Sequence, residues 1–103
     1  MSALGVDPVA GNALLAPYCD RAEGLVHAQA GRTRQAAQAL RRALARFEQL
    51  GVPFEAARTR EQLAAVEPAA AARSLLQAAL STYERLDCAP GTHAVQARLV
   101  ALA

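Results

Sequence analysis

The chain has 103 residues, of which 53% are apolar and 19% are charged, so its composition is that of one folded domain and excludes a disordered segment. Alanine occupies 27 positions, tryptophan is absent and only four residues are aromatic, which favours close-packed helices and excludes an all-β fold. The net charge of +2 is too small to indicate nucleic acid or an anionic membrane as the partner.

The chain shows no sequence signal for a membrane or a secretory pathway. It contains no apolar run of about 18 residues, and residues 1–11 lack the basic start of a signal peptide. Cys19 and Cys88 lie far apart and form no CxxC motif, which is typical of free thiols in a reducing compartment. We therefore expect a cytoplasmic protein.

The predicted elements begin with residues 1–16, a segment punctuated by glycine and proline whose leucines and valines could cap the first helices. Apolar residues then recur at steps of three and four, with prolines at the starts of the segments and glycines at their ends. This pattern predicts five helices, at 17–30, 32–50, 53–66, 68–87 and 92–103. The connections are short, so neighbouring helices must run antiparallel in one helical domain over 17–103.

An internal period of 36 residues relates the first helix pair to the second. Residues of the same type fall in one register: Pro17 and Pro53, Tyr18 and Phe54, Leu40 and Leu76, Phe47 and Tyr83, Glu48 and Glu84. At an offset of 37, Pro53 pairs with Pro90 and Leu63 with Val100, which predicts a one-residue insertion near Cys88. The chain is therefore predicted to hold about two and a half repeats.

The stretch GLVHAQAGRTRQAAQALRRAL, residues 24–44, resembles a tetratricopeptide repeat. The small and packing positions of that motif are matched by Gly24, Gly31, Ala36, Leu40 and Ala43. Asp20 and Glu23 stand where the family has Trp and Leu, and the second helix is about two turns longer than in the standard unit. This longer unit resembles the repeats in the C-terminal regions of bacterial large LuxR-type transcription regulators. The resemblance implies a right-handed solenoid with the first helix of each pair on the concave side.

Two groups of residues could carry chemistry, but each has a better structural explanation. Asp20, Glu23 and His27 could share one helix face and hold a metal or perform acid–base catalysis, although His27 takes an inter-helix packing position in the repeat register. Cys88 and His93 could form a nucleophile pair, but no oriented acid or oxyanion donor accompanies them. We therefore expect no catalytic residue, no metal and no cofactor.

Two surfaces are predicted to contact partners. A basic helix face suited to the carboxylates of an acidic peptide is formed by Arg34, Arg41, Arg42 and Arg46. The last helix is apolar nearly all round, which predicts that a second copy of the chain or another protein covers it. The residues expected at that contact are Val95, Leu99, Val100 and Leu102.

The sequence thus predicts an all-α, tetratricopeptide-like solenoid that acts as a non-enzymatic protein–protein interaction module. It would serve as a scaffold or regulatory repeat domain, bind a peptide or a partner helix, and self-associate as a homodimer. The alternative is a regulatory fragment of a transcription regulator whose arginine-rich helix face contacts nucleic acid. That alternative is weaker, because no aromatic residues alternate with the arginines to stack on bases.

Overall fold

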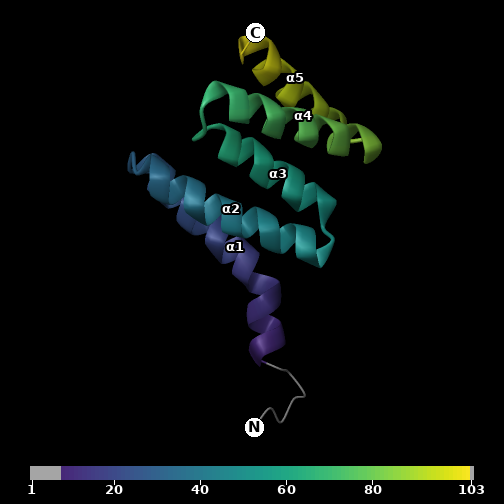
Figure 1. Ribbon diagram of the computed structural model, residues 1–103. Coiled ribbons are helices and arrows are strands. Elements are labelled where there is room, and N and C mark those ends of the chain that lie inside the picture. Colours follow the sequence, from purple (N-terminus) through teal and green to yellow (C-terminus); the bar gives the residue numbers. More distant parts are fainter. Residues whose placement is uncertain (1–7, 103) are drawn as a thin grey trace.

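The computed structural model describes residues 8–102, with side chains from residue 13 onward, and over this range the chain forms five α-helices and no strand (Figure 1). They are α1 (Pro8–Gln29), α2 (Thr33–Leu50), α3 (Pro53–Ala64), α4 (Ala69–Arg85) and α5 (Ala89–Leu102). The all-α prediction is confirmed. Each helix packs mainly on its neighbours in the chain, and the stack is elongated, measuring 55 × 33 × 17 Å along its principal axes.

The buried sides of α2 and α4 use matching positions. Four residues of each helix are at most 4% exposed, and each lies 36 residues from its counterpart: Ala36 and Ala72, Leu40 and Leu76, Ala43 and Ala79, Phe47 and Tyr83. Steps of three and four residues return to one side of a helix, so these residues form one apolar stripe on each helix. The many alanines among them let the neighbouring helices approach closely.

The helix α3 lies between α2 and α4 and is buried on two sides. Ala56 packs with Phe47 of α2, and Leu63 packs with Leu40 of the same helix. Ala57, by contrast, belongs to the larger cluster that α3 forms with α4 and α5. The core is therefore a row of adjoining clusters along the stack.

The turns after α2 and α4 have the same geometry. After α2, Gly51 adopts φ 69°, and the N–H of Val52 donates to the carbonyl of Phe47 at 3.2 Å. After α4, Asp87 adopts φ 56°, and the N–H of Cys88 donates to the carbonyl of Tyr83 at 2.9 Å. A residue in the left-handed conformation, followed by an N–H that donates back to a carbonyl five residues earlier, is a common way in which a helix satisfies its last carbonyls. Both junctions therefore reverse the chain by the same device, 36 residues apart.

Two aromatic pairs join the helices at equivalent places. Tyr18 of α1 meets Phe47 of α2 edge to face, with ring centroids 5.0 Å apart. Phe54 of α3 meets Tyr83 of α4 in the same manner, with centroids 6.0 Å apart. Each ring of the second pair lies 36 residues after its counterpart in the first. Edge-to-face contacts add to the stabilisation that burial alone gives, so each pair fastens one helix to the next.

The predicted start of the first helix is wrong. We expected it at Pro17, but α1 begins at Pro8 and runs through Pro17 without a break. Proline lacks an N–H and leaves the carbonyl of Ala13 without its helical partner, but Ala13 is exposed to water, and the ring of Pro17 is fully buried. Residues 8–16 of the predicted N-terminal cap are thus helical, whereas residues 1–7 lie outside the described residues.

The predicted ends of the later helices also change. The helix α3 ends at Ala64 rather than 66, and α4 spans Ala69–Arg85 rather than 68–87. The helix α5 begins at Ala89 rather than 92, with Pro90 in its first turn, where the missing N–H costs nothing. Because α5 starts 36 residues after α3, the structure shows no insertion near Cys88. None of the five helices has both the length and the apolarity needed to cross a membrane.

Candidate functional site

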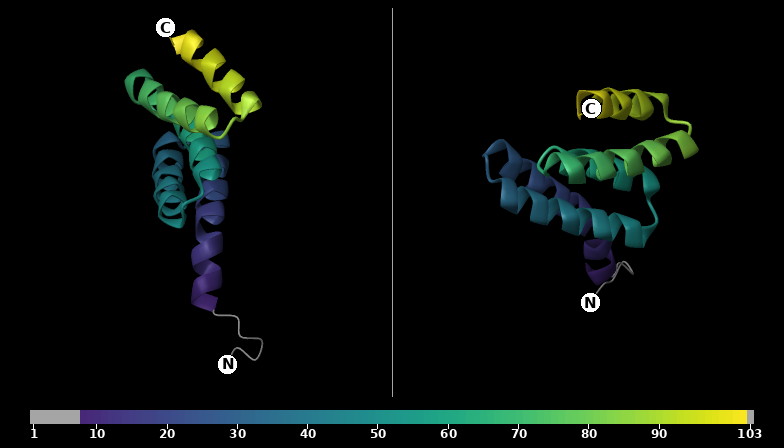
Figure 2. Two further views of the ribbon diagram at one scale, coloured as in Figure 1. Left: turned by 90° about the vertical axis from the view of Figure 1, so that its right-hand side faces the viewer. Right: turned by 45° about the horizontal axis from the view of Figure 1, so that its top comes forward.

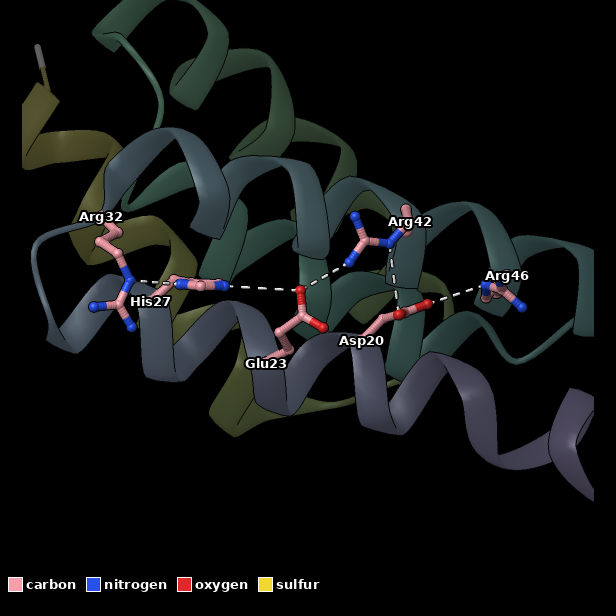
Figure 3. Close-up of polar contacts among 6 residues, drawn as sticks. All are labelled: Asp20, Glu23, His27, Arg32, Arg42 and Arg46. Atoms are coloured by element: carbon pink, nitrogen blue, oxygen red, sulfur yellow. Dashed lines mark hydrogen bonds and ion pairs between the residues drawn. The ribbon is translucent and has the colours of Figure 1, made fainter.

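Two arginines of the predicted basic face are turned toward acidic residues of α1 (Figure 3). Arg46 Nε lies 3.0 Å from Asp20 Oδ2, and Arg42 Nε lies 3.6 Å from Asp20 Oδ1. Nη2 of Arg42 donates a hydrogen bond to Glu23 Oε2 at 3.0 Å. These two arginines therefore hold α1 against α2 and do not present free charge to a partner.

The other two arginines point elsewhere. Arg41 forms an ion pair with Glu67, in the connection between α3 and α4. Arg34 is exposed and forms no ion pair with any residue that the structure describes. Successive residues of a helix are turned by about 100°, so Arg41 and Arg42 project to different sides although they are adjacent in sequence. The four arginines therefore do not form one continuous basic face.

His27 lies between Arg32 and Glu23 in the row of side chains that Figure 3 shows. Its Nδ1 accepts a hydrogen bond from Arg32 Nε at 2.8 Å, and its Nε2 lies 3.7 Å from Glu23 Oε2. Because Arg32 occupies the lone pair of Nδ1, the neutral ring carries its proton on Nε2. No group of three His, Cys, Asp or Glu side chains that could hold a metal is found within residues 13–102. His27 therefore has a structural explanation, as part of the contact between α1 and α2.

Cys88 and His93, the nucleophile pair considered from the sequence, lie in different environments. The side chain of Cys88 packs against the core cluster formed by α3, α4 and α5, while His93 is exposed on α5. Cys19 is an exposed thiol on α1.

The structure divides the four residues predicted for self-association. Val95 is fully buried in the core of its own chain, so its assignment to an outer contact is wrong. Leu99 and Leu102 are partly buried and pack on the same cluster. Only Val100, which is 75% exposed, points outward. Val95, Leu99 and Leu102 face inward because this side of α5 packs on α4. The sequence of α5 is apolar on nearly all sides, so it did not show which side faces the core.

A groove of about 380 Å³ lies between α1, α3 and α5. It is lined by Leu25, Ala28, Arg58, Glu61, Gln62, Ala65, Val66 and Arg98. Arg98 donates to the main-chain carbonyl of Glu61 at 2.9 Å, and Arg58 is exposed and has no ion pair among the described residues. The Oε1 atom of Gln62 is buried without a hydrogen-bond partner. The groove therefore offers apolar walls and two guanidinium groups, of which that of Arg58 has no ion pair among the described residues.

Glu61, the acidic residue that lines this groove, is bound by a side chain of α4. The hydroxyl of Tyr83 donates a hydrogen bond to Glu61 Oε2. Burial of the ring, together with this bond and the nearby carboxylate charge, raises the pKa of Tyr83 far above its usual range. Tyr83 is therefore a neutral donor at physiological pH, and it holds the Glu61 carboxylate toward α4.

Sequence reasoning missed this groove. Arg58, Glu61, Gln62 and Ala65 recur at steps of three and four, so the outward face of the helix predicted at 53–66 contained the signal. The missing information was which other helices flank that face.

A second groove, of about 430 Å³, lies between α2, α3 and α4. Phe47 and Ala56 are among the buried residues that line it, and Glu48 and Arg60 form an ion pair of 2.7 Å at its edge. Arg85 also lines this groove, is exposed and has no ion pair among the described residues, so each of the two grooves offers one unpaired guanidinium group to a charged ligand.

Comparison of the chain with protein-family models, with curated proteins and with solved structures finds no match. Its function is therefore inferred from the surfaces described above.

Proposed function

We propose that the chain is a non-enzymatic protein–protein interaction module that binds an extended peptide or a partner helix in the groove between α1, α3 and α5. The observation that carries the proposal is the lining of this groove by three helices that are far apart in the sequence. Such a groove gives a linear ligand contacts along several elements at once. The titratable side chains nearby are engaged within the chain, Glu61 by Tyr83 and His27 by Arg32, which supports a binding role over catalysis.

We propose further that the five helices form two and a half tetratricopeptide-like units. Three sets of features recur at 36 residues and support this arrangement: the buried stripes of α2 and α4, the turns that follow them, and the two aromatic pairs. In such units the first helix of each pair lines the concave side, and these helices would be α1, α3 and α5. They are the same three helices that line the groove.

The lining of the groove suggests what the ligand carries. Leu25 and Val66 suit an aliphatic side chain, while the guanidinium group of Arg58 suits a carboxylate, which it can bind with two parallel hydrogen bonds. We therefore expect an acidic peptide with at least one aliphatic anchor. The alternative of nucleic acid has less support, because Arg42 and Arg46 would have to leave the carboxylates that they now contact.

A library of random 12-residue peptides displayed on phage tests this function. We expect the wild-type chain to enrich sequences that combine Asp or Glu with Leu, Ile or Val. A labelled peptide from the enriched pool should then bind at least tenfold more weakly to Arg58→Glu, as expected for reversal of a contacting charge. Arg34→Glu is the matched control, since it reverses an exposed arginine outside the groove and should bind as the wild type does. No enrichment, or equal loss in both variants, would contradict the proposal.

A further inference from the structure

The helix α1 turns its apolar side to the solvent and its charged side to the protein. Leu14 and Leu15 are 59% and 61% exposed, and Val26 is 58% exposed. Asp20 and Glu23, by contrast, lie against the arginines of α2. This is the reverse of the usual pattern, in which a surface helix buries its apolar side. We call the exposed set the α1 apolar face: Leu14, Leu15, Tyr18, Ala22, Leu25 and Val26.

The spacing on this face is that of a helix that pairs with another helix. Leu15, Tyr18, Ala22 and Leu25 follow one another at steps of three, four and three residues, which is the spacing of the contact positions of a coiled coil. Leu14 and Val26 flank this line. The N-terminal half of α1 also extends beyond the other helices, so both sides of it are open to a neighbour (Figures 1 and 2).

The α1 apolar face is complementary to itself when two copies run antiparallel. Leu14 and Val26 lie at equal distances on either side of position 20, as do Leu15 and Leu25, and as do Tyr18 and Ala22. An antiparallel pair centred there sets an aliphatic residue opposite an aliphatic one and the large Tyr18 opposite the small Ala22. A parallel pair would instead oppose two tyrosines and leave two alanines facing each other.

The charged residues of α1 that border this face are all paired with charges of α2 or α3, so they add no net charge to it. Arg21 is bound to Glu55 at 2.7 Å, Glu23 is bound to Arg42, and Asp20 contacts arginines of α2. A partner recognised by charge would find no free charge here, whereas a second neutral apolar face matches it.

The area available is also sufficient for a pair. At their exposed fractions the five large side chains of the face offer roughly 500 Å² on each copy, so a pair could bury roughly 1,000 Å², the size at which specific interfaces begin. An interface of this size is expected to be reversible rather than permanent.

We propose that two copies of the chain associate through α1, as an antiparallel helix pair with a twofold axis near residue 20. The residues that make the contact are those of the α1 apolar face, and α5 takes no part in it. The face shares Leu25 with the groove proposed as a peptide site, but Leu14 and Leu15 do not line that groove, so a variant at these two positions tests the association separately from peptide binding.

The solution mass of the chain measures the association. Light scattering after size exclusion, from about 1 to about 500 µM protein, should show a mass that rises toward twice that of the chain. The variant Leu14→Gln/Leu15→Gln keeps good helix formers at exposed positions and should raise the dissociation constant at least tenfold. Val100→Gln is the matched control, because Val100 is the most exposed large apolar side chain among the described residues but lies on α5, and it should leave the mass unchanged. Helical circular dichroism confirms that both variants are folded.

A monomeric wild-type chain over the whole range, or equal masses for the wild type and the α1 variant, would overturn the proposal. Orientation is tested by oxidative cross-linking in a chain whose two native cysteines, Cys19 and Cys88, are replaced by serine and alanine. A mixture of Leu14→Cys and Val26→Cys chains should form mixed disulfide dimers, whereas each variant alone should cross-link far less. Cross-linking of Leu14→Cys to itself as efficiently as to Val26→Cys would refute the antiparallel arrangement.

Discussion

Gly24 of α1 lies directly against Leu40 and Ala36 of α2, and this contact allows a quantitative prediction. A Cβ atom at this position would lie 2.7 Å from Cγ and 2.9 Å from Cδ2 of Leu40, and 3.2 Å from the carbonyl oxygen of Ala36. Leu40 is fully buried and cannot move aside freely. Overpacking of this kind costs about 1 to 3 kcal/mol, and the higher helix propensity of alanine offsets about 1 kcal/mol of it. We expect Gly24→Ala to lower the free energy of unfolding by up to about 2 kcal/mol.

Urea unfolding followed by circular dichroism measures this change, and a thermal scan should show a midpoint lower by up to roughly 15 °C. The matched control is the pair of variants Leu40→Ala and Gly24→Ala/Leu40→Ala. Leu40→Ala alone should cost about 2 to 5 kcal/mol, but in its presence the added alanine at position 24 has room and should cost little or nothing. Strict additivity of the two changes would show that Leu40 is not what limits the residue at position 24.

Two further predictions concern the polar contacts. Tyr83→Phe removes the hydrogen bond to Glu61 and should cost about 1 to 2 kcal/mol at pH 7. Because the pKa of Tyr83 is raised in the folded chain, its contribution is fully present below pH about 10 and is lost as the pH rises above that value. Urea titrations at rising pH should therefore show stability falling more steeply in the wild type than in the variant, and parallel curves would contradict the assignment. Asp20→Asn leaves two arginines of α2 facing a neutral amide, and should cost about 1 kcal/mol or less at low salt. In 1 M NaCl that difference should largely vanish, so a loss that is independent of salt would rule out a charge effect.

The parts of the fold that follow from local pattern could be predicted. The helices α2 and α4 have apolar residues at regular steps, and each ends in a turn, so their positions are clear in the sequence. The start of α1 was predicted wrongly because Pro17 normally marks a first turn. Only the burial of its ring against the rest of the protein shows why the helix continues through it.

The candidate surfaces depended on contacts that the sequence does not show. No acid lies between Arg32 and Arg46 in the chain, yet Asp20 and Glu23 reach Arg42 and Arg46 from another helix. The sequence therefore shows a basic segment where the structure has ion pairs. In the same way, the even apolar composition of α5 did not reveal that Val95 faces inward, and the polar residues of α1 concealed that its apolar side faces outward.

The chain-order packing of the helices has a consequence for how the molecule opens. Most contacts join α1 to α2, α2 to α3, α3 to α4 and α4 to α5, and α3 adds only a few polar and packing contacts to α1 and α5, so each end of the stack is held mainly by one neighbour. In such linear assemblies the terminal elements can unfold while the centre stays intact. Amide hydrogens of α3, which is covered from both sides, should exchange most slowly, and those of α5 and the projecting half of α1 most rapidly. Most contacts are also close in sequence, so refolding should be fast and can begin at any adjacent pair of helices.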